Sequence, residues 1–158
     1  MNALTPTNVA MVQVDRINKK PLEATVESSR QQVLGKIAAP GILARGIVPG
    51  QMYVSMNTTT GTTEMVTLCQ ELYHQAEWFI SAEGEIDGNR YAHVLKPHGT
   101  VTIKGIGEAY KGVYYVTHVT HTFRAKGYTQ FFRAKRNAIM PTGAEDFAGI
   151  ASKPNPYL

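Results

Sequence analysis

The second half of the chain most constrains its fold, because it consists of three β-type runs separated by glycine-bearing turns. The runs lie within Val101–Asn137, and the last of them carries several basic side chains. Short strand-forming runs bounded by glycine and other turn residues are typical of antiparallel sheets. We therefore expect a small antiparallel barrel or sandwich whose surface meets other protein.

One segment of the first half has helical spacing. Between residues 62 and 77, apolar side chains from Met65 to Ala76 recur every three or four positions. Thr62 or Thr63 can cap this segment, and Glu64 is favourable in a first turn. The pattern predicts a helix over 62–77 whose apolar stripe is buried.

The other elements are predicted to be strands. Their expected ranges are 9–17, 22–28, 51–56, 78–86, 90–95, 100–106, 112–123 and 128–136. Strict alternation on the longest strand would place Val116 and Val119 on opposite faces. The predicted class is mainly β (α+β), an antiparallel β-barrel or sandwich with one flanking helix. The chain is expected to comprise an N-terminal arm (1–8), a β-barrel domain (9–140) and a C-terminal tail (141–158).

Size and composition narrow the class of protein. A chain of 158 residues with 43% hydrophobic and 18% charged residues can form one ordinary globular domain. Its formal net charge of +4 is a mild basic excess. The lone cysteine, Cys69, excludes an internal disulfide and is expected to be a buried thiol. No signal peptide or membrane-spanning run is evident.

Three carboxylates alternate in the fourth predicted strand and should share one face. Glu83, Glu85 and Asp87 could form a divalent-cation or acid–base site. They could also be an acidic stripe that faces basic residues of this chain or of a neighbour. We favour the second interpretation, because no histidine or second acidic cluster lies nearby in the sequence.

The last predicted strand concentrates basic residues. Arg133, Lys135 and Arg136 follow Arg124 and Lys126, with aromatic residues between them. Such a strand could be a platform for single-stranded nucleic acid, which makes a small nucleic-acid-binding barrel using residues 124–136 the alternative function. The mild net charge favours an interface strand that meets acidic partners. The predicted interface set is therefore Glu83, Glu85, Asp87, Arg133, Lys135 and Arg136.

The remaining motifs indicate no chemistry. His118 and His121 are three residues apart on a strand, so they point to opposite faces and cannot share one metal ion. The glycines between Gly105 and Gly112 match neither a dinucleotide fingerprint nor a P-loop. We predict no catalytic residues, no metal and no cofactor.

The run from Trp78 to Asn137, about sixty residues long, contains in order the segments EWFISAEGEIDGNRY, VLKPHGTVTIKGIG, YKGVYYVTHVTHTF and GYTQFFRAKRNA. This ordered set resembles the late control D family, the baseplate hub proteins of contractile phage tails and related injection systems. A looser similarity covers EATVESSRQQVLG in the first part of the chain.

This resemblance implies a tail-tube-like β-barrel with a flanking helix, a structural role and no enzymatic activity. Members of the family form the ring that joins the inner tube to the spike. We therefore expect self-association as a trimer or hexamer, with tube, spike and other baseplate proteins as partners and DNA only as passing cargo. The expected location is the virion or an injection particle, assembled in the host cytoplasm. A full hub carries two tube-like barrels, whereas this chain has room for one.

Overall fold

The computed structural model describes residues 6–43, 50–55, 59–125 and 127–145. The fold is mainly β with few helices, as predicted. The chain divides into two compact units, one formed by Met1–Val33 and Ala38–Phe79 and the other by Leu34–Ile37 and Ile80–Leu158. The sequence suggested one barrel domain over 9–140, whereas each unit has its own sheet.

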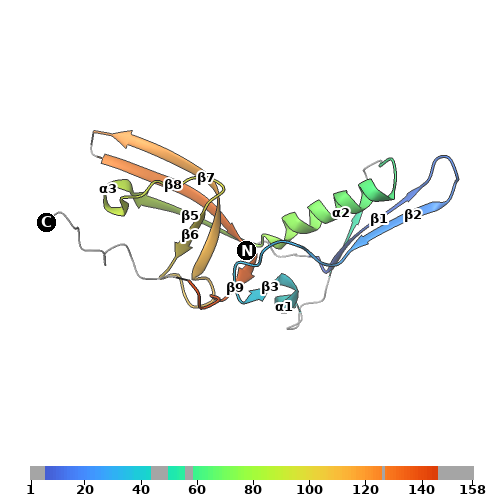
Figure 1. Cartoon of the computed structure of the whole chain (residues 1–158), viewed down its shortest axis with the longest axis horizontal. Coiled ribbons are helices and arrows are strands. Elements are labelled where there is room, and N and C mark those ends of the chain that lie inside the picture. The colour runs from blue at the N-terminus through green and yellow to red at the C-terminus, as the bar shows by residue number, and fades with distance from the viewer. Residues whose placement is uncertain (1–5, 44–49, 56–58, 126, 146–158) are drawn as a thin grey trace. The chain divides into compact units, whose positions relative to one another are not determined.

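The first unit is a three-stranded sheet covered on one face by a long helix (Figure 1). Strand β1 (Asn8–Val14) pairs antiparallel with β2 (Pro21–Val26), which is the predicted hairpin. On its other side β1 pairs in parallel with β4 (Gln51–Val54). A short helix, α1 (Ala39–Leu43), precedes β4 in the chain.

The long helix, α2 (Thr62–Glu77), spans the residues predicted for it. Gly61 is the N-cap and makes no side-chain cap, so neither threonine has the predicted role. Instead the Glu64 carboxylate accepts hydrogen bonds from the backbone N–H and the hydroxyl of Thr60, both at 2.7 Å. None of the described helices is long and apolar enough to span a membrane.

The buried face of α2 forms the core of the first unit. The core residues of the helix and of the sheet are Met65, Cys69, Tyr73, Val9, Met11, Ala24 and Val26. Leu68 and Leu72 pack against this cluster and remain partly exposed. The predicted apolar stripe and the buried thiol are therefore confirmed.

The second unit is built on a four-stranded antiparallel sheet (Figure 1). Its order is β5 (Ile80–Asp87), β8 (Gly127–Arg136), β7 (Gly112–Arg124) and β6 (Thr100–Ile103). Strands β3 (Ile37–Ala38) and β9 (Ala138–Ile139) form a separate two-stranded sheet. Among the described residues the larger sheet ends at β5 and β6, so it is open and does not close into a barrel.

The alternation predicted for β7 is wrong beyond Val116. A β-bulge between Val116 and His118 adds one residue to this strand. Val116 pairs with Ala134, and Val119 pairs with Phe132. Since the two β8 partners are two residues apart and both buried, Val116 and Val119 face the same side of the sheet.

The strand predicted at 90–95 does not form. Helix α3 (Gly88–Tyr91) forms at its start instead, because the Asp87 side chain accepts hydrogen bonds from the backbone N–H groups of Asn89 and Arg90, at 3.0 and 3.4 Å. The remaining segment is held by buried Gln130 on β8. Its side-chain oxygen accepts from the Leu95 N–H at 2.8 Å, and its amide nitrogen donates to the His93 carbonyl at 2.6 Å.

Candidate interaction site

The three predicted carboxylates lie on one face of β5, beside β8. Glu83, Glu85 and Asp87 are all exposed, and the residues between them are less so. Their partners in the β8 register are, in the same order, Arg133, Phe131 and Thr129. The period-two alternation therefore placed these side chains correctly on a shared face.

One of the acids is paired with the basic strand of the same chain. A Glu83 carboxylate oxygen lies 2.9 Å from Nε of Arg133. Both side chains are about 60% exposed, at 58% and 60%. The Arg133 guanidinium also lies 5.9 Å from the centre of the Phe131 ring. An exposed pair of this kind contributes only about 0–1 kcal/mol to stability.

The other two carboxylates have different roles. Asp87 caps α3 through one oxygen. Glu85 forms no ion pair or hydrogen bond within the described part of the chain. Glu85 is therefore the carboxylate of the stripe that is most available to a second molecule.

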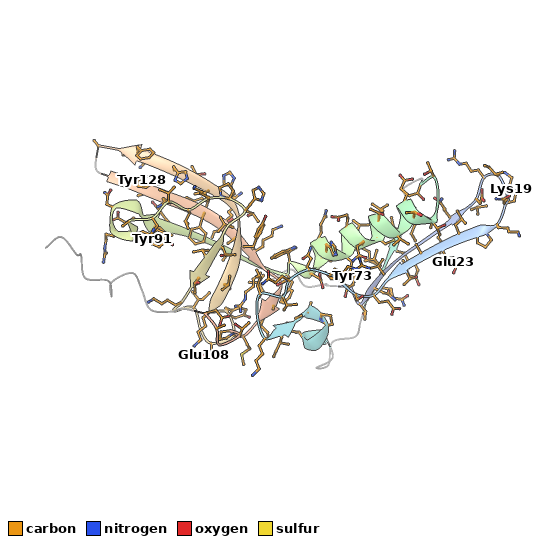
Figure 2. The ribbon with its side chains drawn as sticks, viewed as in Figure 1. Lys19, Glu23, Tyr73, Tyr91, Glu108 and Tyr128 are labelled. Atoms are coloured by element: carbon orange, nitrogen blue, oxygen red, sulfur yellow. The ribbon has the colours of Figure 1, made fainter. Side chains whose placement is uncertain are left out.

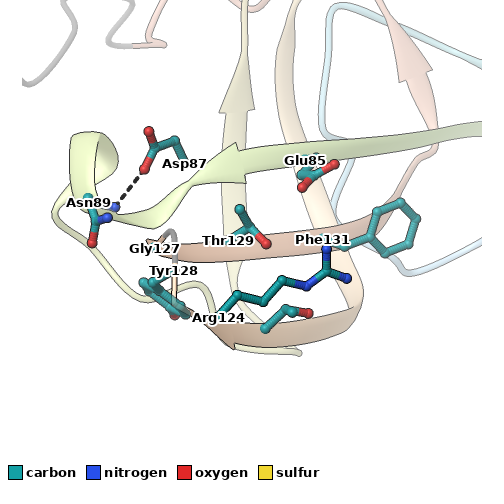
Figure 3. Close-up of a pocket in the computed structure, with 9 residues that line it drawn as sticks. Glu85, Asp87, Asn89, Arg124, Gly127, Tyr128, Thr129 and Phe131 are labelled. Carbon is teal, nitrogen blue, oxygen red and sulfur yellow. Dashed lines mark hydrogen bonds between the residues drawn. The ribbon is translucent and has the colours of Figure 1, made fainter.

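Glu85 and Asp87 line an open pocket of about 370 Å³ at one end of the sheet (Figure 3). The lining residues are Glu85, Asp87, Asn89, Thr122, Arg124, Gly127, Tyr128, Thr129 and Phe131. In Figure 3, Glu85 on β5 and Arg124 on β7 lie on either side of β8, which carries Thr129 and Phe131 between them. The pocket thus combines two carboxylates, one guanidinium and two aromatic rings.

Arg136 does not lie on this surface. The prediction that it is an interface residue is therefore wrong. Its side chain is fully buried, at 0% exposure. The guanidinium donates to four backbone carbonyls, those of Leu34 (3.0 Å), Tyr110 (3.0 Å), Lys111 (2.8 Å) and Met140 (2.9 Å). It also lies 5.4 Å from the centre of the Tyr114 ring. The strand alternation that exposes Arg133 and Lys135 turns Arg136 inward.

Two glycines make room for the buried guanidinium. A Cβ on Gly35 would lie 2.7 Å from Nη2 of Arg136, and one on Gly112 would lie 2.6 Å from the same atom. Gly112 also has a φ of +139°, which side-chain-bearing residues rarely adopt. Arg136 is therefore a structural centre of the second unit.

The exposed face of the sheet is balanced in charge. Its three carboxylates, on β5, are accompanied by three cations, Arg124, Arg133 and Lys135. Lys126 lies outside the described residues. Phe132 is buried on the opposite face, so it is not available to stack on a base. A balanced face of this kind attracts nucleic acid less than the basic strand alone suggested.

The two histidines of β7 face opposite sides, as predicted. In the register of β7 and β8, His118 pairs with Arg133 and His121 pairs with Gln130, and these partners lie on opposite faces of β8. Within the residues that the structure describes, no three or more His, Cys, Asp or Glu side chains are grouped closely enough to hold a metal ion.

An exposed aromatic group next to the pocket was not found from the sequence. The Phe123 and Tyr128 rings stack at 4.5 Å with an interplanar angle of 8°, and Phe123 is 77% exposed. His121 stacks on the Tyr128 ring at 5.9 Å, and its Nδ1 lies 2.7 Å from the Tyr128 hydroxyl. The sequence did contain a signal for this pair. Phe123 and Tyr128 lie just before and just after the hairpin turn, so they are paired across the two strands.

No protein-family model and no curated protein matches this sequence.

Proposed function

We propose that this chain is a structural component of a phage-tail baseplate or contractile injection system, of the hub or tube type. In this role it associates into a trimeric or hexameric ring that joins the inner tube to the spike. Its partners are tube, spike and other baseplate proteins, and DNA passes the ring only as cargo. The protein resides in the virion or injection particle and is assembled in the host cytoplasm.

The observation that carries the proposal is the ordered set of segments between Trp78 and Asn137 that resembles the hub family. Nearly all of this run belongs to the second compact unit, which extends from Ile80 onward. The segments EWFISAEGEIDGNRY, YKGVYYVTHVTHTF and GYTQFFRAKRNA contribute the hydrogen-bonded strands β5, β7 and β8. A resemblance distributed over three neighbouring strands supports a common architecture better than a match to one motif.

The first unit supports an assembly role through an uncovered apolar surface. The sheet face opposite α2 carries Val12, Val14 and Tyr53, which are 55%, 62% and 67% exposed. Apolar side chains gathered on one sheet face indicate a surface that binds other protein. Within the described residues, the edge strands of both larger sheets, β2 and β4 in one and β5 and β6 in the other, each have one side without a strand partner. These edges could pair with strands of another chain.

The test is reconstitution of the chain with tube and spike proteins, scored by electron microscopy and native mass spectrometry. We expect ring-sized particles that contain this chain. Val12→Thr with Val14→Thr removes apolar surface and keeps β-branched residues, so it should preserve the fold and weaken incorporation. Val94→Thr is the matched control, because Val94 is 61% exposed and lies in the other unit.

A folded chain that binds neither tube nor spike protein would contradict the proposal. Salt-dependent binding of single-stranded DNA by such a chain would favour the nucleic-acid alternative, with residues 124–136 as its surface.

A further inference from the structure

The turn of the β1–β2 hairpin is a basic projection with an exposed apolar side chain. We call residues Asp15, Arg16, Ile17, Asn18, Lys19 and Lys20 the hairpin end. Figure 2 shows Lys19 at the outermost part of this hairpin. Ile17 is 89% exposed, which is unusual for a large aliphatic side chain. The three cations and one carboxylate give the hairpin end a formal charge of +2.

The carboxylate of the hairpin end is used to hold the turn. Asp15 accepts hydrogen bonds from the Ile17 N–H at 2.8 Å and from the Asn18 side-chain amide at 2.6 Å. The Asp15 N–H donates to the Lys20 carbonyl at 2.8 Å. The turn is thus ordered by its own hydrogen bonds, and the cations Arg16, Lys19 and Lys20 form no ion pair within the described residues. A pre-organised basic surface of this kind loses little conformational entropy when it binds.

The pocket of the second unit has the opposite character. Glu85, Asp87 and Arg124 give its lining a formal charge of −1. Phe131 supplies an aromatic surface beside Glu85, its partner in the β5–β8 register (Figure 3). The volume of about 370 Å³ is at the small end of binding pockets, which span about 300–1,000 Å³, and suits one or two side chains.

We propose that the hairpin end of one copy of this chain docks into the pocket of the next copy. Ile17 packs against Phe131, and the flanking cations Arg16 and Lys20 face Glu85 and Asp87. A second copy is the occupant that the observations favour, because every copy carries one basic hairpin end and one acidic pocket. A repeated one-to-one contact then neutralises both surfaces. The inference rests on the proposed ring and names the contact between its neighbours.

The geometry of such a contact has a consequence for assembly. Two different surfaces meet, so the interface is heterologous, and repetition either closes a ring or continues as a filament. A variant chain that lacks one of the two surfaces should stop growth of the assembly, because it can bind one neighbour but not a second.

Charge reversal on each surface, followed by mixing, tests the contact. Arg16→Glu with Lys20→Glu changes the hairpin end from +2 to −2, and Glu85→Lys changes the pocket from −1 to +1. Lys19 is left unchanged because its φ is +55°, and Asp87 because it caps α3. Glu71→Lys is the matched control, an exposed charge reversal on α2 outside both surfaces.

Self-association of the full chain is measured by sedimentation velocity and native mass spectrometry at about 50 mM and about 300 mM salt. We expect the wild type and the Glu71→Lys control to associate, more weakly at high salt. Each reversed variant alone should associate at least about tenfold more weakly. An equimolar mixture of the two should regain association as alternating, even-numbered species, because an acidic hairpin end then meets a basic pocket and the reverse.

Three results would overturn the inference: a monomeric wild type at low salt, reversed variants that associate like the control, or a mixture of folded variants that does not recover. If a reversed variant does not fold, Arg16→Gln with Lys20→Gln and Glu85→Gln replace it. We expect these glutamine variants to associate more weakly than the wild type and without dependence on salt. Association equal to that of the wild type would again overturn the inference. A wild type that binds tube and spike proteins but not itself would refute this contact and leave the proposed function standing.

Discussion

Replacing Arg136 by methionine should strongly destabilise the second unit. Methionine keeps much of the unbranched stem and removes the guanidinium, which donates to four backbone carbonyls in the fully buried centre of the unit. The substitution therefore tests whether these hydrogen bonds hold together segments that are far apart in the sequence.

The expected loss of stability depends on which of the four carbonyls keep a hydrogen-bond donor in the variant. The Tyr110 carbonyl also accepts the Tyr114 hydroxyl, and the Met140 carbonyl also accepts the Lys36 N–H, so these two acceptors keep a donor. A buried polar group that loses its partner costs about 1–3 kcal/mol. Counting the Leu34 carbonyl alone, we expect a loss of at least about 1–3 kcal/mol in the free energy of unfolding of the second unit.

Arg133→Met is the matched control, because it makes the same change on the same strand at an exposed site. It removes the surface pair with Glu83 and the exposed contact with the Phe131 ring, and should cost less than about 1 kcal/mol. Urea denaturation followed by circular dichroism, with hydrogen exchange of peptides from β8 to isolate the second unit, measures both losses. A loss below about 1 kcal/mol for Arg136→Met, equal to that of the control, would refute the structural role of the guanidinium.

Three further outcomes are expected. Gly112→Ala should destabilise the second unit by at least about 1–3 kcal/mol, because φ is +139° and a Cβ would meet the buried guanidinium, whereas Gly50→Ala has open space and should change stability little. The Cys69 thiol should react with a thiol reagent only as fast as the first unit unfolds, since it is fully buried and burial raises its pKa. The backbone and hydroxyl hydrogen bonds from Thr60 hold the pKa of Glu64 below 4.5, so their contribution to stability is present above the unfolded pKa and is lost as the pH falls through the lowered value. Acid titration of Glu64→Gln beside the wild type, followed by the helical circular dichroism signal, should show a smaller loss in the variant.

Elements specified by neighbouring residues could be predicted from the sequence. The helix over Thr62–Glu77, its buried stripe and the β1–β2 hairpin all follow from local periodicity and from turn residues. The shared face of Glu83, Glu85 and Asp87 follows in the same way, because the period of two is a property of the strand itself.

The tertiary structure alone decided how these elements are grouped. The pairing of β5 with β8 and the separation into two units depend on contacts between residues far apart in the chain. The β7 bulge after Val116 depends on the partner strand, which sets the register. Because of the bulge, each later side chain of β7 lies on the side of the sheet opposite to the one that strict alternation predicts. Arg136 is the clearest case. In the sequence it looks like one more surface cation, and its burial depends on carbonyls contributed by positions 34, 110, 111 and 140. The local sequence thus determines helix, strand and turn, whereas the side of the sheet that is buried depends on long-range packing.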